Sequence, residues 1–219
     1  MSRKTYPGAL AEALAPLGFK REGMDLSRRH DDLLEQVNVQ VSQIAGVTAN
    51  LWTRNLATED LHRQVFSGRP PAETQIFLTR IGTIIDGHDR WWRRDPNGPA
   101  ELADAVRVHG PPYLESHRSL ESQADWFGRR ELKWRNSYSR IYLALTLYRL
   151  GELDEACAAL RNPAKALAPS DQAEIDILLR WLGCPGRSGE VASQGRASPP
   201  SISQSPALRR GNFPPAGAR

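Results

Sequence analysis

The stretch "LLEQVNVQVSQ", residues 33–43, decides the fold class of this 219-residue chain. Apolar and polar side chains alternate along it, and Val37, Val39 and Val41 occupy one face. The polar positions on the other face are Gln36, Asn38, Gln40 and Ser42. Because successive side chains of a strand point to opposite faces, the pattern predicts a β-strand with one buried face and one polar face.

The segments next to this strand show the same alternation. Residues 24–29 alternate before a polar turn, and "VTANLWTRNL" (47–56) alternates after a turn at Ala45–Gly46. Short alternating runs joined by polar turns are typical of an antiparallel meander. A further stretch, "TQIFLTRIGTII" (74–85), fits a helix or a strand. Its β-branched and aromatic content favours a fourth strand, bulged at Gly82.

Helical periodicity surrounds these strands. Apolar residues recur every three or four positions through 6–17, and a glycine follows. A second helix is predicted through 100–108, where the sequence at 109–112 ends it, and a third begins after Ser119, a candidate cap. The sequence therefore predicts an α+β domain over 1–135, in which helices pack on an antiparallel meander of about four strands.

Residues 136–185 differ from that domain because they contain only helical patterns. The helix at 138–150 is apolar on two sides, so it needs neighbours on both sides. Two more helices are predicted at 153–160 and 170–182. The residues at the spacing of a single tetratricopeptide-like hairpin are Leu143, Ala144, Leu147, Gly151, Leu153, Ala156 and Leu160. An array needs about three repeats, so we expect an all-α extension that packs as a cap on the main domain.

The last segment, 186–219, is rich in Gly, Pro, Ser and Arg and has no apolar period, which predicts disorder. Such a segment is either a native tail or a read-through of the wrong frame. It carries five arginines against Glu190, and the whole chain has 29 basic and 25 acidic residues. Residues 1–185 therefore hold 24 of each. This neutral body argues against nucleic-acid binding, which needs clustered positive charge.

The cysteines and the N-terminus bear on location. Cys157 and Cys184 lie far apart, match no metal spacing, and Cys157 sits among apolar residues of a predicted helix. We expect two inert thiols in a reducing compartment rather than a disulfide. Met1–Lys4 lead into no apolar signal region, and no apolar run is long enough to cross a bilayer. The sequence predicts a cytoplasmic protein that has no membrane partner.

Signatures of catalysis and cofactor binding are missing from the sequence. It contains no nucleophile elbow, phosphate loop, dinucleotide fingerprint or zincin helix, and its five histidines show no ligand spacing. We therefore predict no catalytic, metal or cofactor residues and favour a protein that is not an enzyme. The alternative is an enzyme without a recognisable motif, with its site on the polar strand face. The residues of that site would be Gln36, Asn38, Gln40 and Asn50.

The stretch "IIDGHDRWWRR", residues 84–94, is the best candidate for an interaction site. Its Asp-Gly-His-Asp sequence indicates a turn, and adjacent tryptophans point in different directions, so one ring is expected inside and one at the rim. Trp and Arg are enriched at protein interfaces. The predicted patch comprises Arg90, Trp92, Arg93 and Arg94. Neighbouring aspartates at 86, 89 and 95 offer the alternative that these arginines are neutralised within the chain.

A second basic and aromatic run is "WFGRRELKWR", residues 126–135. Aromatic rings among cations can stack on single-stranded nucleic acid. The competing interpretation is a helix end whose aromatic side chains belong to the core and whose cations complement the helix C-terminus. The neutral body favours the second interpretation.

Several short motifs, taken in order, resemble a bacterial family, the domain of unknown function 4304. They are "LGFKREG" (17–23), "LSRRHDDLLEQVNVQVSQ" (26–43), "VTANLWT" (47–53), "RIG" (80–82), "DRWW" (89–92) and "PPYLESHRSLES" (111–122). The resemblance covers roughly residues 5–130. It implies one α+β domain with a meander covered by helices, and it brings no established activity or catalytic residue. By analogy, families of this style include immunity and partner-binding proteins of bacterial conflict systems.

The sequence thus predicts a non-catalytic module that binds another protein, with an immunity-type role as one form. The alternatives are the enzyme on the polar sheet face and a weak nucleic-acid binder that uses residues 126–135.

Overall fold

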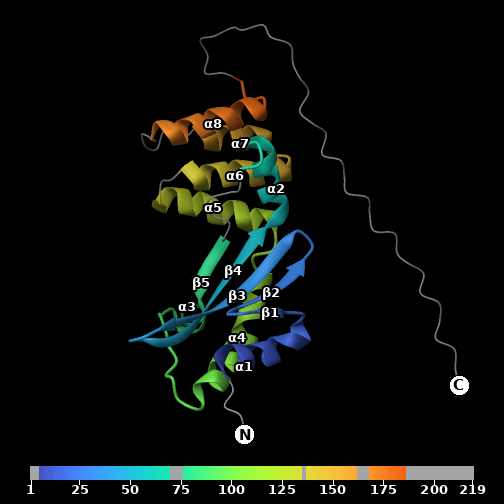
Figure 1. The fold of residues 1–219 in the computed structure, drawn as a ribbon. Coiled ribbons are helices and arrows are strands. Elements are labelled where there is room, and N and C mark those ends of the chain that lie inside the picture. Colours follow the sequence, from blue (N-terminus) through green and yellow to red (C-terminus); the bar gives the residue numbers. More distant parts are fainter. Residues whose placement is uncertain (1–4, 70–75, 135–136, 162–167, 186–219) are drawn as a thin grey trace, which may run out of the picture. The chain divides into compact units, whose positions relative to one another are not determined.

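The computed structural model describes residues 5–69, 76–134, 137–161 and 168–185 (Figure 1). The chain divides into two units, Met1–Cys184 and Pro185–Arg219, and nearly all of the second lies outside the described residues. The disorder predicted for 186–219 therefore falls outside them too. The first unit has an α+β fold, as the sequence predicts.

Five antiparallel strands form one sheet in chain order, so each strand pairs with the next along the sequence. They are β1 (Lys20–Glu22), β2 (Asp25–His30), β3 (Leu33–Ser42), β4 (Gly46–Asn55) and β5 (Ile76–Arg80). The meander predicted from the alternation is confirmed, with β3 and β4 as its longest strands. Strand β1 pairs with β2 and adds a fifth strand that the sequence pattern does not predict. None of its three residues is apolar, and all three are exposed.

One expectation about this sheet is wrong. The stretch predicted as a bulged fourth strand is a strand only to Arg80, where helix α3 (Ile81–Asp86) begins. A Cβ atom at Gly82 would lie 2.5 Å from the backbone nitrogen of Arg90. The glycine therefore allows the chain after α3 to pack directly on the helix, rather than marking a bulge.

The first hydrophobic core lies between the sheet and the helices that cover one of its faces. Helix α1 (Tyr6–Leu14), followed by a 3₁₀ turn (Ala15–Leu17), packs with α4 (Gly98–Glu115) over this face (Figure 1). Buried core residues from the strands are Leu26, Val37, Val39, Val47, Ala49 and Leu51. Burial of this apolar face of β2–β4 is the main force that holds the sheet on its helices.

Helix α4 also corrects a predicted boundary. The sequence at His109–Pro112 predicts its end, yet the helix continues through both prolines to Glu115. Proline removes a backbone donor and crowds the preceding turn. Leu114, in the last turn, is buried in the first core. This packing outweighs the loss of regular hydrogen bonds.

A layer of helices forms a second hydrophobic core at one end of the sheet (Figure 1). Its helices are α2 (Leu56–Val65), α5 (Leu120–Trp134), α6 (Ser137–Leu150), α7 (Leu153–Arg161) and α8 (Pro169–Trp181). The side chain of Ser119 accepts a hydrogen bond from the backbone of Ser122, the cap expected before α5. Phe77 and Phe127 share this core with Tyr142 and Leu145, so it contains residues from both sides of the boundary predicted at 135/136.

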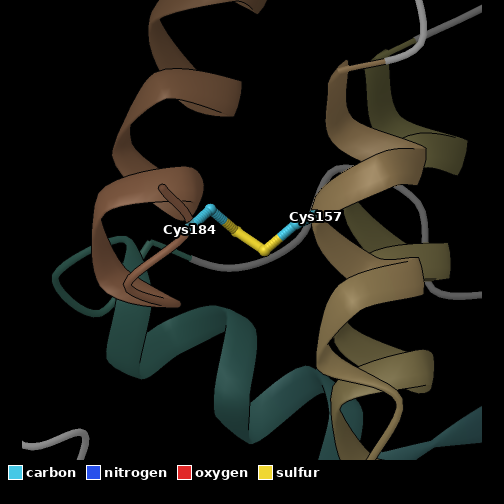
Figure 2. The surroundings of a disulfide bond; sticks show 2 residues. All are labelled: Cys157 and Cys184. Atoms are coloured by element: carbon cyan, nitrogen blue, oxygen red, sulfur yellow. A yellow bond between two sulfur atoms is a disulfide. The ribbon is translucent and has the colours of Figure 1, made fainter. Parts of the chain in front are cut away.

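The cysteines are paired, which overturns the expectation of two inert thiols. Cys157 of α7 and Cys184, just after α8, form a disulfide with their Cα atoms 5.7 Å apart (Figure 2). The disulfide joins two helices of the second core across a sequence separation of 27 residues. Sequence spacing alone does not reveal this pairing, because it depends on how α7 and α8 pack.

Buried His62 makes the stability of the second core depend on pH. Its ring lies 4.5 Å from that of Phe66 and 5.9 Å from that of Tyr142. Burial lowers the pKa of His62 below its ordinary value of 6.5. The unfolded chain therefore binds this proton more readily, so the contribution of neutral His62 is present above pH 6.5 and is lost as pH falls further.

We expect His62→Phe to flatten the fall in the free energy of unfolding between about pH 7 and pH 5. Urea unfolding at both pH values measures the change. The control is His109→Phe, at an exposed position of α4, and it should keep the wild-type slope. An unchanged slope in His62→Phe would refute this assignment.

Candidate functional site

The loop between α3 and α4 is fixed against the start of β4. Trp92 donates its backbone N–H to the carbonyl of Val47 at 2.7 Å, and the N–H of Val47 bonds the carbonyl of Trp92 at 3.0 Å. Gly46 has a φ of +113°, and a Cβ atom there would lie 2.3 Å from the Trp92 oxygen. The glycine thus permits this close approach, which fixes the backbone from which Arg93 and Arg94 project.

The two tryptophans have different roles. Trp92 is 4% exposed and belongs to the first core, so its ring is not available to a partner. This burial removes Trp92 from the predicted interaction patch. Trp91 is half-buried at the surface, where its indole nitrogen lies 3.2 Å from Asp89 Oδ2 and the Arg80 guanidinium lies 5.1 Å from its ring.

The aspartates around this loop are engaged away from its arginines. Asp89 pairs with Arg80, and Asp86 accepts the backbone N–H of His88. Asp95 accepts the backbone N–H groups of Asn97 and Gly98, where α4 begins. These three carboxylates therefore do not neutralise Arg90, Arg93 or Arg94 through ion pairs.

Arg90, Arg93 and Arg94 are exposed, and no carboxylate within the described ranges forms an ion pair with them. The Arg90 guanidinium lies 5.0 Å from the ring of Trp92, and Arg94 donates a hydrogen bond to the Ser42 carbonyl. Their positive charges are therefore not compensated by ion pairs in the described part of the chain. The three arginines remain the charged part of the candidate site.

Two apolar side chains lie at the turn that Arg94 contacts. Ile44, in the β3–β4 turn, is 100% exposed, and Val41, near the end of β3, is 52% exposed. We call Val41, Ile44, Arg90, Arg93 and Arg94 the hairpin-tip surface. Sequence reasoning missed both apolar residues, because Val41 follows the alternation of a buried face and Ile44 lies in a turn.

The second candidate site is the polar face of the sheet. Strand register aligns Asp25, Asn38, Asn50 and Arg80 in one row across β2–β5. Asn38 donates to Asp25 at 2.7 Å, and Asn50 donates to the side chain of Gln40 at 3.0 Å.

A hollow of about 750 Å³ lies over this row and is open to solvent. The residues that line it are Asp25, Asn38, Gln40, Asn50, Trp52, Leu78, Thr79, Arg80, Thr83 and Asp89. Of the four residues predicted for this face, the hollow includes Asn38, Gln40 and Asn50. Gln36 accepts a hydrogen bond from the Trp52 indole at 3.0 Å and is not part of the lining.

The basic and aromatic run predicted at 126–135 lies in α5 up to Trp134, and residue 135 falls outside the described residues. Phe127 is buried in the second core, and half-buried Trp126 has its ring 5.4 Å from that of Phe77. Arg129 pairs with Asp125. The side chains of residues 130–135 lie outside the described part. The described aromatic side chains are thus packed against the protein and do not form an exposed stacking surface.

No family model, curated protein or solved structure matches this chain. Among the described residues, no group of three or more His, Cys, Asp or Glu side chains is placed to hold a metal ion. Within the described ranges, none of the helices combines the length and the apolar character that a membrane span requires.

Proposed function

We propose that this chain is a non-catalytic module that binds another protein through the hairpin-tip surface. The observation that carries the proposal is fully exposed Ile44 in the β3–β4 turn, which Arg94 reaches through a hydrogen bond to the Ser42 carbonyl. Arg90, Arg93 and Arg94 lie on the adjoining loop and form no ion pair with a carboxylate among the described residues. Arg is enriched at interface hot spots, and an exposed apolar side chain gains free energy when a partner buries it. An immunity-type role, and membership of the family called domain of unknown function 4304, are likewise proposals, and both rest on the sequence resemblance.

The chemistry of this surface defines the partner. An exposed isoleucine gains most from an apolar pocket, and unpaired arginines gain most from carboxylates at its rim. The partner is therefore a protein with an apolar depression bordered by acidic residues. Its association should be faster at low ionic strength, because complementary charges steer the encounter.

Nucleic-acid binding and enzymatic activity, the two alternative functions, are less well supported than protein binding. Nucleic acid offers charge for the arginines but no pocket for Ile44, and residues 1–185 have no net charge. For the enzyme, the hollow over the polar sheet face is open to water. A catalytic site that excludes water would need a cover over this hollow.

The cytoplasmic location predicted from the sequence stays a proposal. The paired cysteines argue against it, since disulfides persist mainly in oxidising compartments. Alkylation of free thiols at the moment of cell lysis, followed by mass spectrometry, distinguishes the cytoplasm from an oxidising compartment. Paired Cys157 and Cys184 would place the protein in an oxidising compartment, and two alkylated thiols would support the cytoplasm.

Ile44→Asp combined with Arg93→Glu should abolish capture of the partner from source cells, with an affinity loss of at least about 100-fold on the purified pair. The two changes remove the apolar contact and reverse one charge. The matched control is Ile177→Asp with Arg180→Glu on α8, which alters an exposed isoleucine and an exposed arginine elsewhere. Equal loss in both variants, or loss in neither, would contradict the proposal.

A further inference from the structure

We infer that the hollow over the polar sheet face is a binding site for a neutral saccharide. This site is separate from the hairpin-tip surface, and the inference does not depend on the proposed function. A volume of about 750 Å³ lies within the range of small-ligand sites. The chemistry of the lining defines the class of ligand.

The amide side chains of the hollow keep hydrogen-bonding capacity for a ligand. Among the described residues, Asn38, Gln40 and Asn50 each make one side-chain hydrogen bond. A primary amide offers two donors and an acceptor oxygen with two lone pairs. Each of the three therefore retains at least one donor and one further acceptor position. Thr79 and Thr83, also in the lining, add hydroxyl groups that both donate and accept.

The charges of the hollow favour a neutral ligand. Arg80 pairs with Asp89, so it is not free to neutralise an anion. Asp25 adds a second carboxylate at the other side of the row, where it accepts from Asn38. An anionic ligand would therefore meet two carboxylates and one arginine that is already paired. A cation would find no cluster of three acidic or histidine ligands in the described part of the chain.

Polar and apolar surface contribute about equally to the hollow, which suits a saccharide, with its hydroxyl groups and apolar C–H faces, better than a purely apolar ligand. Leu78 is half-exposed, and Trp52 is largely buried with its indole nitrogen bonded to Gln36. A sugar hydroxyl both donates and accepts hydrogen bonds, so it can accept from the N–H group of one side-chain amide and donate to the carbonyl oxygen of the next. In an open site, each hydrogen bond to the sugar replaces one to water, so its net contribution to the binding free energy is small. We therefore expect a dissociation constant of about 1 mM.

Side-chain amide signals in a ¹H–¹⁵N spectrum test this inference directly. Maltose, lactose and N-acetylglucosamine are each titrated to about 50 mM, a large excess over the expected dissociation constant. We expect at least one of them to shift the amide signals of Asn38, Gln40 and Asn50 in a saturable way. Asn50→Ala should weaken this binding about tenfold. Exposed Gln64→Ala on α2 should leave it unchanged.

Three results would overturn the inference. The first is no shift of these signals with any of the three sugars. The second is equal affinity in wild type and Asn50→Ala, with Gln40→Ser as the second variant if the backbone spectrum of Asn50→Ala shows misfolding. The third is a response to tetraglycine without a response to sugars, which would assign the hollow to a peptide.

Discussion

Replacing Glu35 with Gln should lower the free energy of unfolding by about 3–5 kcal/mol. Glu35 is 0% exposed and lies on the inner face of β3, where it pairs with Arg28 of β2. Arg118, between α4 and α5, donates to its other oxygen at 2.7 Å. Neutralising the carboxylate leaves two largely buried guanidinium groups without their main counter-charge, and this desolvation cost is what makes the effect large.

Equilibrium urea unfolding measures this loss, and the thermal midpoint should fall by about 6–20 °C in parallel. Glu22→Gln on β1 is the matched control, because that side chain is exposed and should change the free energy of unfolding by less than about 0.5 kcal/mol. If Glu35→Gln changes the free energy of unfolding by less than about 1 kcal/mol, the ion pairs of Glu35 with Arg28 and Arg118 do not stabilise the fold.

Removing the disulfide should have the second largest effect. The double variant Cys157→Ser and Cys184→Ser should lose about 3–4 kcal/mol, because the crosslink no longer restricts the unfolded chain across 27 residues. A reducing agent should produce a similar loss in the wild-type protein.

The reducing agent should have no effect on the double serine variant, which is the internal control. Urea unfolding with and without the agent measures both quantities. Two free thiols in the unreduced wild-type protein, detected by alkylation and mass spectrometry, would contradict the pairing. Equal stability of wild type and variant would show that the pairing does not stabilise the second core.

The elements with a strong side-chain period could be predicted from the sequence. Val37 and Val39 alternate with amides in β3, and this pattern leads to the strand, its polar face and the α+β class. The helix after Ser119 and those of the C-terminal region carry helical periods and are observed. Short or weakly patterned elements were missed. The three residues of β1 are exposed, and α2 begins directly after β4 at an Asn55 cap.

The candidate site was only partly predictable, because burial depends on neighbours that are distant in sequence. Loop composition points to Arg90, Arg93 and Arg94, which are exposed in the structure, but the choice between Trp91 and Trp92 depends on the bridge to Val47. Glu35 interrupts the apolar face of β3, a sign of a buried charge that the alternation alone does not explain. Its partner Arg118 lies 83 residues away, so the pairing becomes visible only in the folded chain.

Photo-crosslinking in the source cells tests the central claim most directly. Benzoylphenylalanine replaces Ile44 in the hairpin-tip surface, and in a separate variant it replaces Ile177 on α8. We predict a single major protein adduct at position 44, lost when Arg93→Glu is added, and no such adduct at position 177. An adduct at position 177 without one at position 44, or an adduct to nucleic acid at position 44, would contradict the proposal that this surface binds a protein.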